Sequence, residues 1–480
     1  MKDKFSYVKK EDRKKILLLA DDIRLHSGVA TMAREIVVGT AHHFNWVQLG
    51  GAVTHPEDGK GFDLSQEVNS HAGIDDASVI LFATSGYGTT EKVRELIAKE
   101  KPAAILHFTD PRYWTWLYDI EREIRQQIPL LYLNIWDDYP APLYNKSYYE
   151  CCDLLMGISK QTVNINRIVL GDQAKDKVIT YVPHGINETQ FYPITDDEEY
   201  KQLELVRDSM FEGKDIDFVV FWNSRNIRRK SPGDVILSYK HFCDLIGKEK
   251  AKKCALVMHT QPVDQNGTDL LAVREAICDP EYVNVFFSSN RLTSQQMNTL
   301  YNVADVTMLI SSNEGWGLSL TESMMAGTMI IGNVTGGMQD QMRFVDENGK
   351  WFTPSAKVPS NHMGTYKEHG EWAVPVFPSN ISLVGSVPTP YIFDDRCDFR
   401  DVAQAIKEVY ELPKEERERR GKAGHAWVTS DESGMSARKM CENLINSVEE
   451  CFTKFTPRPA YNLTKIEALP AKRVNHVLTY

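Results

Sequence analysis

The sequence predicts an α/β protein of two domains, each built on a doubly wound parallel sheet. Short apolar runs rich in β-branched residues alternate with amphipathic segments, which is typical of parallel β-α-β units. The chain of 480 residues also exceeds what one hydrophobic core usually supports, so two cores are expected. A single large α/β domain with insertions is the alternative.

Apolar runs mark the strands of a first domain, residues 1–190. The runs are continuous rather than alternating, as expected for parallel strands that are buried on both faces. The expected strands are Ile16–Ala20, Val79–Thr84, Ala103–Phe108, Pro129–Ile135, Leu154–Ile158 and Val178–Val182. The pattern then lapses into a proline and an acidic run, so residues 191–215 are expected to link two domains.

The same alternation resumes in a second domain, residues 216–432. Its expected strands are Asp217–Trp222, Ala255–His259, Val283–Phe287, Val306–Ile310 and Met329–Gly332. Residues 345–395 are rich in proline, glycine and tryptophan, and an irregular insertion is expected there. Residues 433–480 are expected to form a last helix and a tail. The helices expected to close the chain are Phe399–Leu412, Lys414–Val428 and Gly434–Phe452.

Composition excludes several classes of protein without naming a function. With 42% hydrophobic and 25% charged residues, the chain has the composition of a folded globular protein. A net charge of -11 argues against a protein that coats nucleic acid, although a local basic cleft is still compatible with it. No apolar stretch approaches the roughly 20 residues of a membrane span, and the eight cysteines lack zinc-binding spacing. We expect a cytoplasmic protein without structural zinc or integral membrane association.

The most informative segment is 311–322, which directly follows an expected strand and leads into a helix. Glu314 and Glu322 flank the turn Gly315-Trp316-Gly317-Leu318. Open parallel sheets bind ligands at the carboxyl ends of their strands, so these carboxylates are expected in a cleft between the domains. Carboxylates accept hydrogen bonds from sugar diols, and free N–H groups at a helix start suit an anion. A glutamate pair that merely flanks a helix N-terminus is the alternative.

This segment resembles the E-x7-E motif of retaining GT-B glycosyltransferases of family 4, which include glycogen-synthase-like enzymes. The resemblance implies two Rossmann-like domains that face a central cleft, with a C-terminal helix that crosses back to the first domain. It implies that Glu314 holds hydroxyls of the transferred sugar and that Glu322 holds the donor ribose. Gly336 and Gly337 resemble a loop of glycogen and starch synthases whose backbone faces the donor.

A basic segment from Arg225 to Lys230 follows the first expected strand of the second domain. By the same resemblance, Arg225 and Lys230 are the phosphate-binding pair. Fixed cations in a dry cleft would stabilise the charge that develops on a departing diphosphate, so no metal ion is expected. Arg228 and Arg229 are interpreted as part of a solvated or nucleic-acid-binding face.

The first domain contributes two candidates. Gly28 opens a helix after the first strand, where a glycine lets the backbone approach a phosphate; simple turn chemistry is the alternative. His107 ends a strand and resembles the histidine that lines the sugar pocket in these transferases; a structural histidine is the alternative. Asp137 and Asp138 are discounted as a metal-binding pair, because the prolines after them indicate a turn.

The resemblance implies a retaining transferase that uses a nucleotide-sugar donor, with UDP-sugar expected, and holds no permanent cofactor. We expect front-side retention, in which the departing phosphate oxygen helps to take the acceptor proton. A covalent intermediate on Glu314 is the mechanistic alternative. A nucleotide-sugar-binding protein without activity and a sugar-phosphate epimerase are the other classes. The complete set of cations and carboxylates disfavours the first, and the motif itself disfavours the second.

The acceptor expected from the sequence is a hydroxymethylated base in duplex DNA, with or without a sugar already attached. Residues 372–392 look like a phage or viral subgroup, for which the location would be the host cytoplasm. Basic stretches at 9–15 and at Lys472-Arg473 are candidates for phosphate contacts, and Arg112 with its aromatic neighbours for holding a flipped base. A polysaccharide, lipid or small glycoside is the alternative acceptor.

Overall fold

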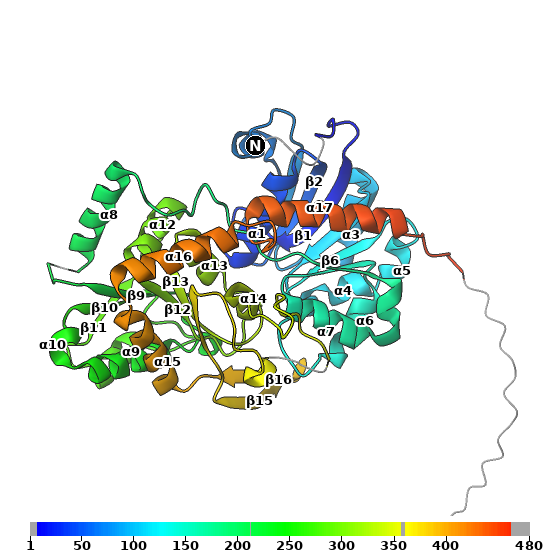
Figure 1. Ribbon diagram of the computed structural model, residues 1–480. Helices are drawn as coiled ribbons and strands as arrows, with labels where there is room; N and C mark the ends of the chain where they lie inside the picture. Colours follow the sequence, from blue (N-terminus) through cyan, green and yellow to red (C-terminus); the bar gives the residue numbers. More distant parts are fainter. Residues whose placement is uncertain (1–6, 212, 357–360, 462–480) are drawn as a thin grey trace, which may run out of the picture.

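Two α/β domains, each with a parallel sheet at its centre, make up the chain (Figure 1). The computed structural model describes residues 7–211, 213–356 and 361–461. The predicted fold class is confirmed, because both sheets are doubly wound and their carboxyl ends face one another across a cleft.

The sheet of the first domain has the order β3-β4-β2-β1-β5-β6-β7-β8. Strand β3 pairs antiparallel with β4, and the other pairings are parallel. The order reverses between β1 and β5, which is where such sheets bind ligands. The strands are β1 (Lys14–Asp21), β2 (Phe44–Gly51), β3 (Gly61–Asp63), β4 (Val79–Ala83), β5 (Ala104–Phe108), β6 (Leu130–Asn134), β7 (Leu154–Gly157) and β8 (Val178–Tyr181).

Strand β2 was not predicted, because polar residues interrupt its apolar run. Gln48 is buried in it, where its side-chain amide donates to the carbonyl of Asp21 at 2.8 Å. The backbone N–H of Ile23 donates to the Gln48 side-chain oxygen at 3.3 Å. A polar side chain satisfied in this way can occupy a buried strand position, which hides the strand from a hydropathy pattern.

The helices of the first domain begin at side-chain caps in several places. The Ser27 hydroxyl accepts from the N–H of Ala30 at 3.0 Å and starts α1, and Thr89 and Ser159 cap α3 and α7 in the same way. The helices are α1 (Gly28–Thr40), α2 (Ser65–Ala72), α3 (Thr90–Glu100), α4 (Thr115–Tyr118), α5 (Glu121–Ile124), α6 (Lys146–Glu150) and α7 (Lys160–Leu170). Short 3₁₀ helices occur at Pro111–Trp114, Leu143–Asn145 and Gly171–Asp176.

The sheet of the second domain is parallel throughout, in the order β11-β10-β9-β12-β13-β14. Strand β14 lies inside residues 345–395, so the prediction of an irregular insertion was wrong there. It is only four residues long and contains Pro375, which a strand tolerates at a sheet edge. The strands are β9 (Phe218–Asn223), β10 (Cys254–His259), β11 (Asn284–Ser288), β12 (Val306–Leu309), β13 (Met329–Asn333) and β14 (Ala373–Val376).

The same segment also forms an antiparallel hairpin of β15 (Asn380–Ser386) and β16 (Thr389–Arg396), separate from both large sheets. The predicted linker likewise contains a helix, α8. The helices of this half are α8 (Asp197–Met210), α9 (Pro232–Ile246), α10 (Lys248–Ala251), α11 (Leu270–Ile277), α12 (Ser294–Val303), α13 (Leu318–Met325), α14 (Met338–Met342), α15 (Phe399–Glu411), α16 (Lys414–Val428) and α17 (Ala437–Lys454). Short 3₁₀ helices occur at Arg228–Lys230 and His362–Gly364.

The last helix, α17, crosses back to the first domain, as predicted, and packs against α1, β7 and β8 (Figure 1). Its start is fixed by backbone pairing with the segment after β8. Ile186 donates to the carbonyl of Met435 at 2.9 Å, and Ala437 donates back to Ile186 at 2.9 Å. The chain entering the linker and the helix returning from the second domain therefore hold one another.

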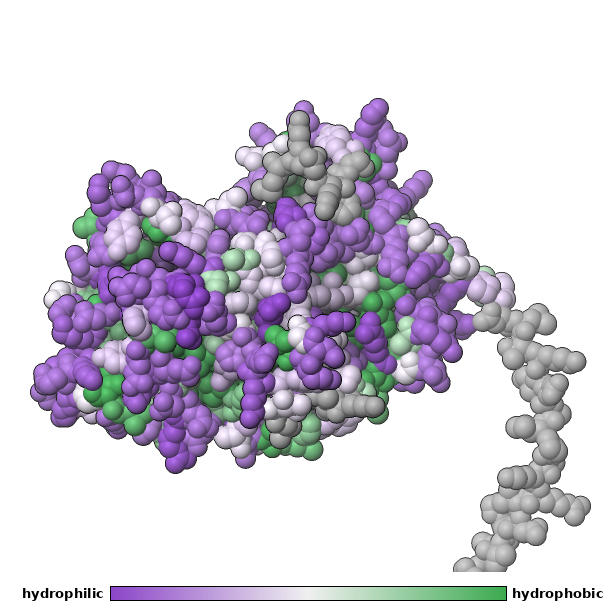
Figure 2. Space-filling model, viewed as in Figure 1, coloured by the Kyte–Doolittle hydropathy of each residue, from purple (hydrophilic) through white to green (hydrophobic). Residues whose placement is uncertain are grey.

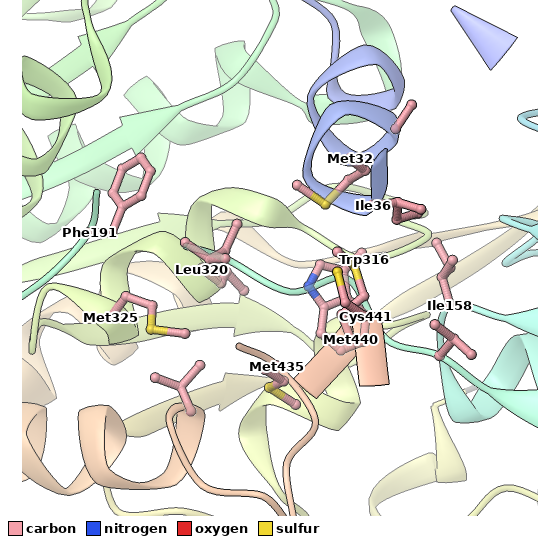
Figure 3. Packing of buried hydrophobic residues seen from close by; sticks show 14 of the residues in the cluster. Met32, Ile36, Ile158, Phe191, Trp316, Leu320, Met325, Met435, Met440 and Cys441 are labelled. Atoms are coloured by element: carbon pink, nitrogen blue, oxygen red, sulfur yellow. The ribbon is translucent and has the colours of Figure 1, made fainter. Parts of the chain in front are cut away.

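One apolar cluster continues from the first domain into the second (Figure 3). It joins Met32 of α1, Leu320 of α13 and Met440 of α17, with Trp316 among them. Since these residues come from both halves, burial of apolar surface between them stabilises the facing arrangement of the domains.

The face of the molecule in Figure 2 is mainly hydrophilic, with smaller apolar patches between charged side chains. Among the residues that the structure describes, no helix combines the length and apolar character that crossing a bilayer requires.

We expect Gly185→Ala to destabilise the protein, because a Cβ at this position would overlap the backbone of Ser436 and Ala437. Overpacking of this kind costs about 1–3 kcal/mol. Thermal unfolding measures the effect. Gly233→Ala is the matched control, because a Cβ there meets nothing within 4 Å. Equal melting temperatures for the two variants would contradict the close packing of α17.

Candidate active site

A cleft of about 850 Å³ lies between the domains, where the carboxyl ends of the two parallel sheets meet. Its walls come from the segments that follow β1, β6, β9 and β12, and from the start of α13. The predicted site residues that line it are Gly28, Arg225, Lys230, Glu314, Gly315, Trp316, Gly317, Leu318 and Glu322. The structure thus gathers most of the predicted set in one place.

Glu314 is the centre of the charged network in this cleft. The ammonium group of Lys230 pairs with its Oε2, and Nη1 of Arg229 lies 3.2 Å from the same oxygen. Burial alone would raise the pKa of Glu314, but the two cations lower it to about 2. The carboxylate therefore stays ionised at neutral pH and acts as a hydrogen-bond acceptor rather than a proton donor.

Lys230 is buried together with its partner. Burial lowers the pKa of the Lys230 ammonium group, and the charge of Glu314 opposes this change. Two opposite charges that are removed from water stabilise each other, because burial of either charge without its partner would cost a large desolvation free energy. The pair is consequently a fixed feature of the cleft.

Arg229 was interpreted from the sequence as a surface cation, but it belongs to the site. Besides its contact with Glu314, it donates to the carbonyl of Asn313 at 2.8 Å. The segment Arg228–Lys230 is a 3₁₀ helix with three residues per turn, so successive side chains point in different directions. Arg228 also lines the cleft, but its side chain is 69% exposed and pairs with Asp394 of the hairpin at 2.8 Å. The sequence of this basic segment alone did not indicate which of its cations contacts Glu314.

Arg225 lies at the edge of the cleft with its side chain 65% exposed. Its Nε is 3.3 Å from Oδ2 of Asp264. An exposed ion pair of this kind holds a side chain weakly. The guanidinium group is therefore free to turn toward an anion in the cleft.

Glu322 lies on α13 and also lines the cleft. The hydroxyl of Tyr301 donates to its Oε2 at 2.5 Å, and the amide of Asn223 donates to the Tyr301 oxygen at 2.8 Å. Burial raises the pKa of Glu322, and the bond from Tyr301 opposes this effect. Tyr301 and Asn223 fix the orientation of the carboxylate, and neither was predicted, because they come from other elements.

Two helices begin at the cleft. Gly28 starts α1 and Leu318 starts α13, and both residues line the cavity. The N-terminal N–H groups of a helix lack partners within it and carry partial positive charge. Backbone of this kind suits a phosphate or sugar oxygen.

Gly336 and Gly337 do not line the cleft. A Cβ at Gly336 would overlap the carbonyl oxygen of Glu314, and one at Gly337 would overlap that of Gly315. The N–H of Gly337 donates to the Glu314 carbonyl at 3.0 Å. Both glycines pack directly against the backbone of the turn that carries Glu314, and this packing stabilises the turn.

The structure does not bring His107 to the cleft. Its ring is fully buried, stacks on Tyr132 at 4.5 Å between centroids, and places Nε2 2.9 Å from the Tyr118 hydroxyl. Burial lowers the pKa of His107 to about 3, so the ring is neutral. Successive strand residues face opposite sides of a sheet, and it is the next residue, Phe108, that lines the cleft. His184, interpreted as a linker residue, lines it as well.

Asp137 and Asp138 were interpreted as turn residues, yet both line the cleft after β6. Burial raises the pKa of Asp137 to about 6, although Arg229 opposes the change, and the pKa of Asp138 is raised for the same main reason. In the described part of the chain, no group of three or more His, Cys, Asp or Glu residues is arranged to hold a metal ion.

The chain is similar in sequence and in fold to known proteins. Residues 282–358, which contain Glu314 and Glu322, match the family model described as "Glycosyl transferases group 1". Mannosylfructose-phosphate synthase from Agrobacterium fabrum is 23% identical over 192 residues, or 40% of this chain. That match spans 39% of the relative's length.

Solved structures extend the likeness to nearly the whole chain. HepE from Anabaena in complex with UDP and glucose superposes with a TM-score of 0.59 at 12% identity, over 91% of this chain and all of that one. Sucrose-phosphate synthase from Thermosynechococcus elongatus gives 0.61 at 16% identity, over 92% of this chain and all of that one. The fold is the GT-B arrangement of two Rossmann-like domains. Together with the family match, it supports glycosyltransferase activity.

We expect Lys230→Met and Glu314→Gln to be strongly coupled in stability, because each substitution leaves a buried charge short of its partner. The double variant should be more stable than the sum of the single effects predicts, by about 0.5–3 kcal/mol. Chemical denaturation of the four proteins measures the difference. The same cycle on the exposed pair Lys92–Asp58 should show little coupling. Additive effects at Lys230 and Glu314 would contradict the pairing.

Proposed function

We propose that the protein is a retaining glycosyltransferase that moves a sugar from a UDP-type nucleotide donor to a hydroxyl group without a metal ion. The observation that carries the proposal is the charged network of Glu314 with the buried Lys230 and the half-buried Arg229, with Glu322 on the adjoining helix in the same cleft. It supplies cations for a diphosphate and carboxylates for sugar hydroxyls side by side.

The donor fits this cleft in one orientation. Glu322, held by Tyr301, accepts hydrogen bonds from the ribose, and Glu314 accepts them from the transferred sugar. The diphosphate then lies near Lys230 and the mobile guanidinium of Arg225, at the N-termini of α1 and α13. HepE, which shares the fold, was solved with UDP and with UDP-glucose, in agreement with a UDP-sugar donor.

Front-side retention suits the charges of the site. In this step the bond from the anomeric carbon to the phosphate oxygen breaks while the bond to the acceptor oxygen forms on the same face. The acceptor proton passes to the departing phosphate oxygen. Glu314 is a poor nucleophile for the alternative mechanism, because its Oε2 is engaged by two cations and its pKa is about 2. The cations instead stabilise the negative charge on the leaving diphosphate.

The DNA acceptor stays a prediction from the sequence. Within the basic stretch 9–15, Arg13, Lys14 and Lys15 form ion pairs with carboxylates, and Arg112 pairs with Asp110. Lys472-Arg473 lies outside the described residues. Paired cations contribute less to binding of a phosphate backbone than free ones do. Mannosylfructose-phosphate synthase and sucrose-phosphate synthase are by name synthases of sugar phosphates, so small carbohydrates are the other acceptor class to test.

We expect the purified protein to release UDP from a UDP-sugar in the presence of an acceptor, with an α-linked product from an α-linked donor. Chromatography and NMR of the product measure release and anomeric configuration. Lys230→Ala should lower kcat about a hundredfold, which corresponds to ~3 kcal/mol of lost transition-state stabilisation. The exposed Lys252→Ala is the control. Nucleotide binding without release would indicate a non-catalytic protein, and sugar isomerisation without release would indicate an epimerase.

Activity is expected to survive removal of divalent metal, because protein cations take the position at the diphosphate. The test compares turnover before and after EDTA treatment and after addition of Mg²⁺ or Mn²⁺. Loss of turnover with EDTA and its recovery with a divalent ion would show that the leaving group needs a metal.

A further inference from the structure

A second cavity adjoins the cleft on the side away from Glu322. It has a volume of about 360 Å³ and shares residues with the larger cleft, among them Asp137, Asp138 and Arg228. The β15–β16 hairpin forms its other wall through Val384, Ser386 and Thr389. The cavity therefore opens toward the place where the transferred sugar lies in the proposed function.

The hairpin that closes this cavity belongs to the second domain in sequence but is anchored on the first. Nη1 of Arg112 donates to the Thr389 hydroxyl at 2.6 Å. The N–H of Phe393 donates to the carbonyl of Tyr139 at 2.6 Å. On the other side, the amide of Asn313, next to Glu314, donates to the carbonyl of Phe393 at 2.9 Å. The wall is thus held in place by both halves of the active site.

The arginine and aspartate side chains that line the cavity differ in whether they have ion-pair partners. Its two arginines are engaged, Arg112 by Asp110 at 2.6 Å and Arg228 by Asp394 at 2.8 Å. Neither Asp137 nor Asp138 forms an ion pair with any described residue. Burial raises the pKa of both carboxyl groups, and a carboxyl group exchanges hydrogen bonds with sugar hydroxyl groups in its ionised and in its protonated form. The lining therefore favours a neutral ligand with several hydroxyl groups over a phosphorylated one.

Asp137 and Asp138 line both the cleft and the second cavity, so they lie where the two spaces meet. The donor sugar of the proposed function lies on one side of them, and the hairpin lies on the other. An acceptor hydroxyl bound here is therefore between the donor and the hairpin.

We propose that this cavity is the acceptor site and that the acceptor is a small uncharged carbohydrate, or the uncharged end of one, bound by Asp137, Asp138 and the hairpin. The inference rests on the proposed function, since it assumes a donor sugar beside Glu314. The volume is near the lower end of roughly 300–1,000 Å³ for small-molecule pockets, which leaves room for a terminal sugar unit but not for a polymer chain.

The test measures kcat/KM for several acceptors with a single donor. This donor is chosen by a screen of UDP-sugars. The acceptors are neutral mono- and disaccharides, the same sugars as phosphates, and hydroxymethylated duplex DNA. We expect kcat/KM for a neutral sugar to exceed that for its phosphate at least tenfold. Asp138→Asn should raise the acceptor KM at least tenfold more than the donor KM, because it changes a side chain that holds acceptor hydroxyl groups. Asp197→Asn, exposed on α8, is the matched control and should change neither.

Thr389→Val is a second variant, because it removes the hydroxyl that receives Arg112 while leaving both carboxylates in place. It should also raise the acceptor KM more than the donor KM. A preference for phosphorylated sugars, incorporation into hydroxymethylated DNA alone, or an Asp138→Asn variant with an unchanged acceptor KM would overturn the proposal. If only the acceptor proposal fails, the protein should still bind UDP in calorimetry and still release UDP from the donor. Absence of both UDP binding and release would instead overturn the proposed function, and the acceptor site with it.

Discussion

The arrangement of the cleft depends on the ion pairs that the buried Glu314 makes with the buried Lys230 and the half-buried Arg229. The charges come from loops after β12 and β9, two neighbouring strands of the second sheet. A buried carboxylate without these cations would take up a proton or turn outward, since desolvation of an unpaired charge is costly. The pairs therefore fix the relative position of two loops, and with them the cations and the carboxylate that a sugar diphosphate would meet.

Other parts of the structure support this network from a distance. Gly336 and Gly337 let a second loop pack directly on the backbone of the Glu314 turn, where a side chain would not fit. Tyr301 and Asn223 orient Glu322 through a chain of two hydrogen bonds. The apolar cluster around Trp316 and α17 holds the domains face to face. These contacts hold Glu314 and Glu322 in place, as transition-state stabilisation by fixed charges requires.

The acceptor side is built differently, because it combines the ends of first-domain strands with the β15–β16 hairpin of the second domain. The hairpin pairs with neither large sheet and is held by hydrogen bonds to loops on both sides of the cleft. A wall of this kind is able to vary without disturbing either core. We infer that it sets acceptor choice while the donor side sets the chemistry.

The sequence by itself determined most strands of the two parallel sheets, because short apolar runs and glycine-bearing turns are local features, but it did not reveal β2, β3 or β14. It also predicted most residues that line the cleft, since Glu314, Arg225 and Lys230 lie in loops that directly follow predicted strands and Glu322 lies on the helix after one of them. Tertiary structure decided what depends on direction and on distant partners. Strand alternation turned His107 into the core, and a 3₁₀ turn brought Arg229 to Glu314 while Arg228 pairs with the hairpin. Packing of the hairpin against the loop after β6 made Asp137 and Asp138 part of a cavity. Side-chain direction and contacts between residues hundreds of positions apart leave no periodic signal along a chain, so only the folded structure shows them.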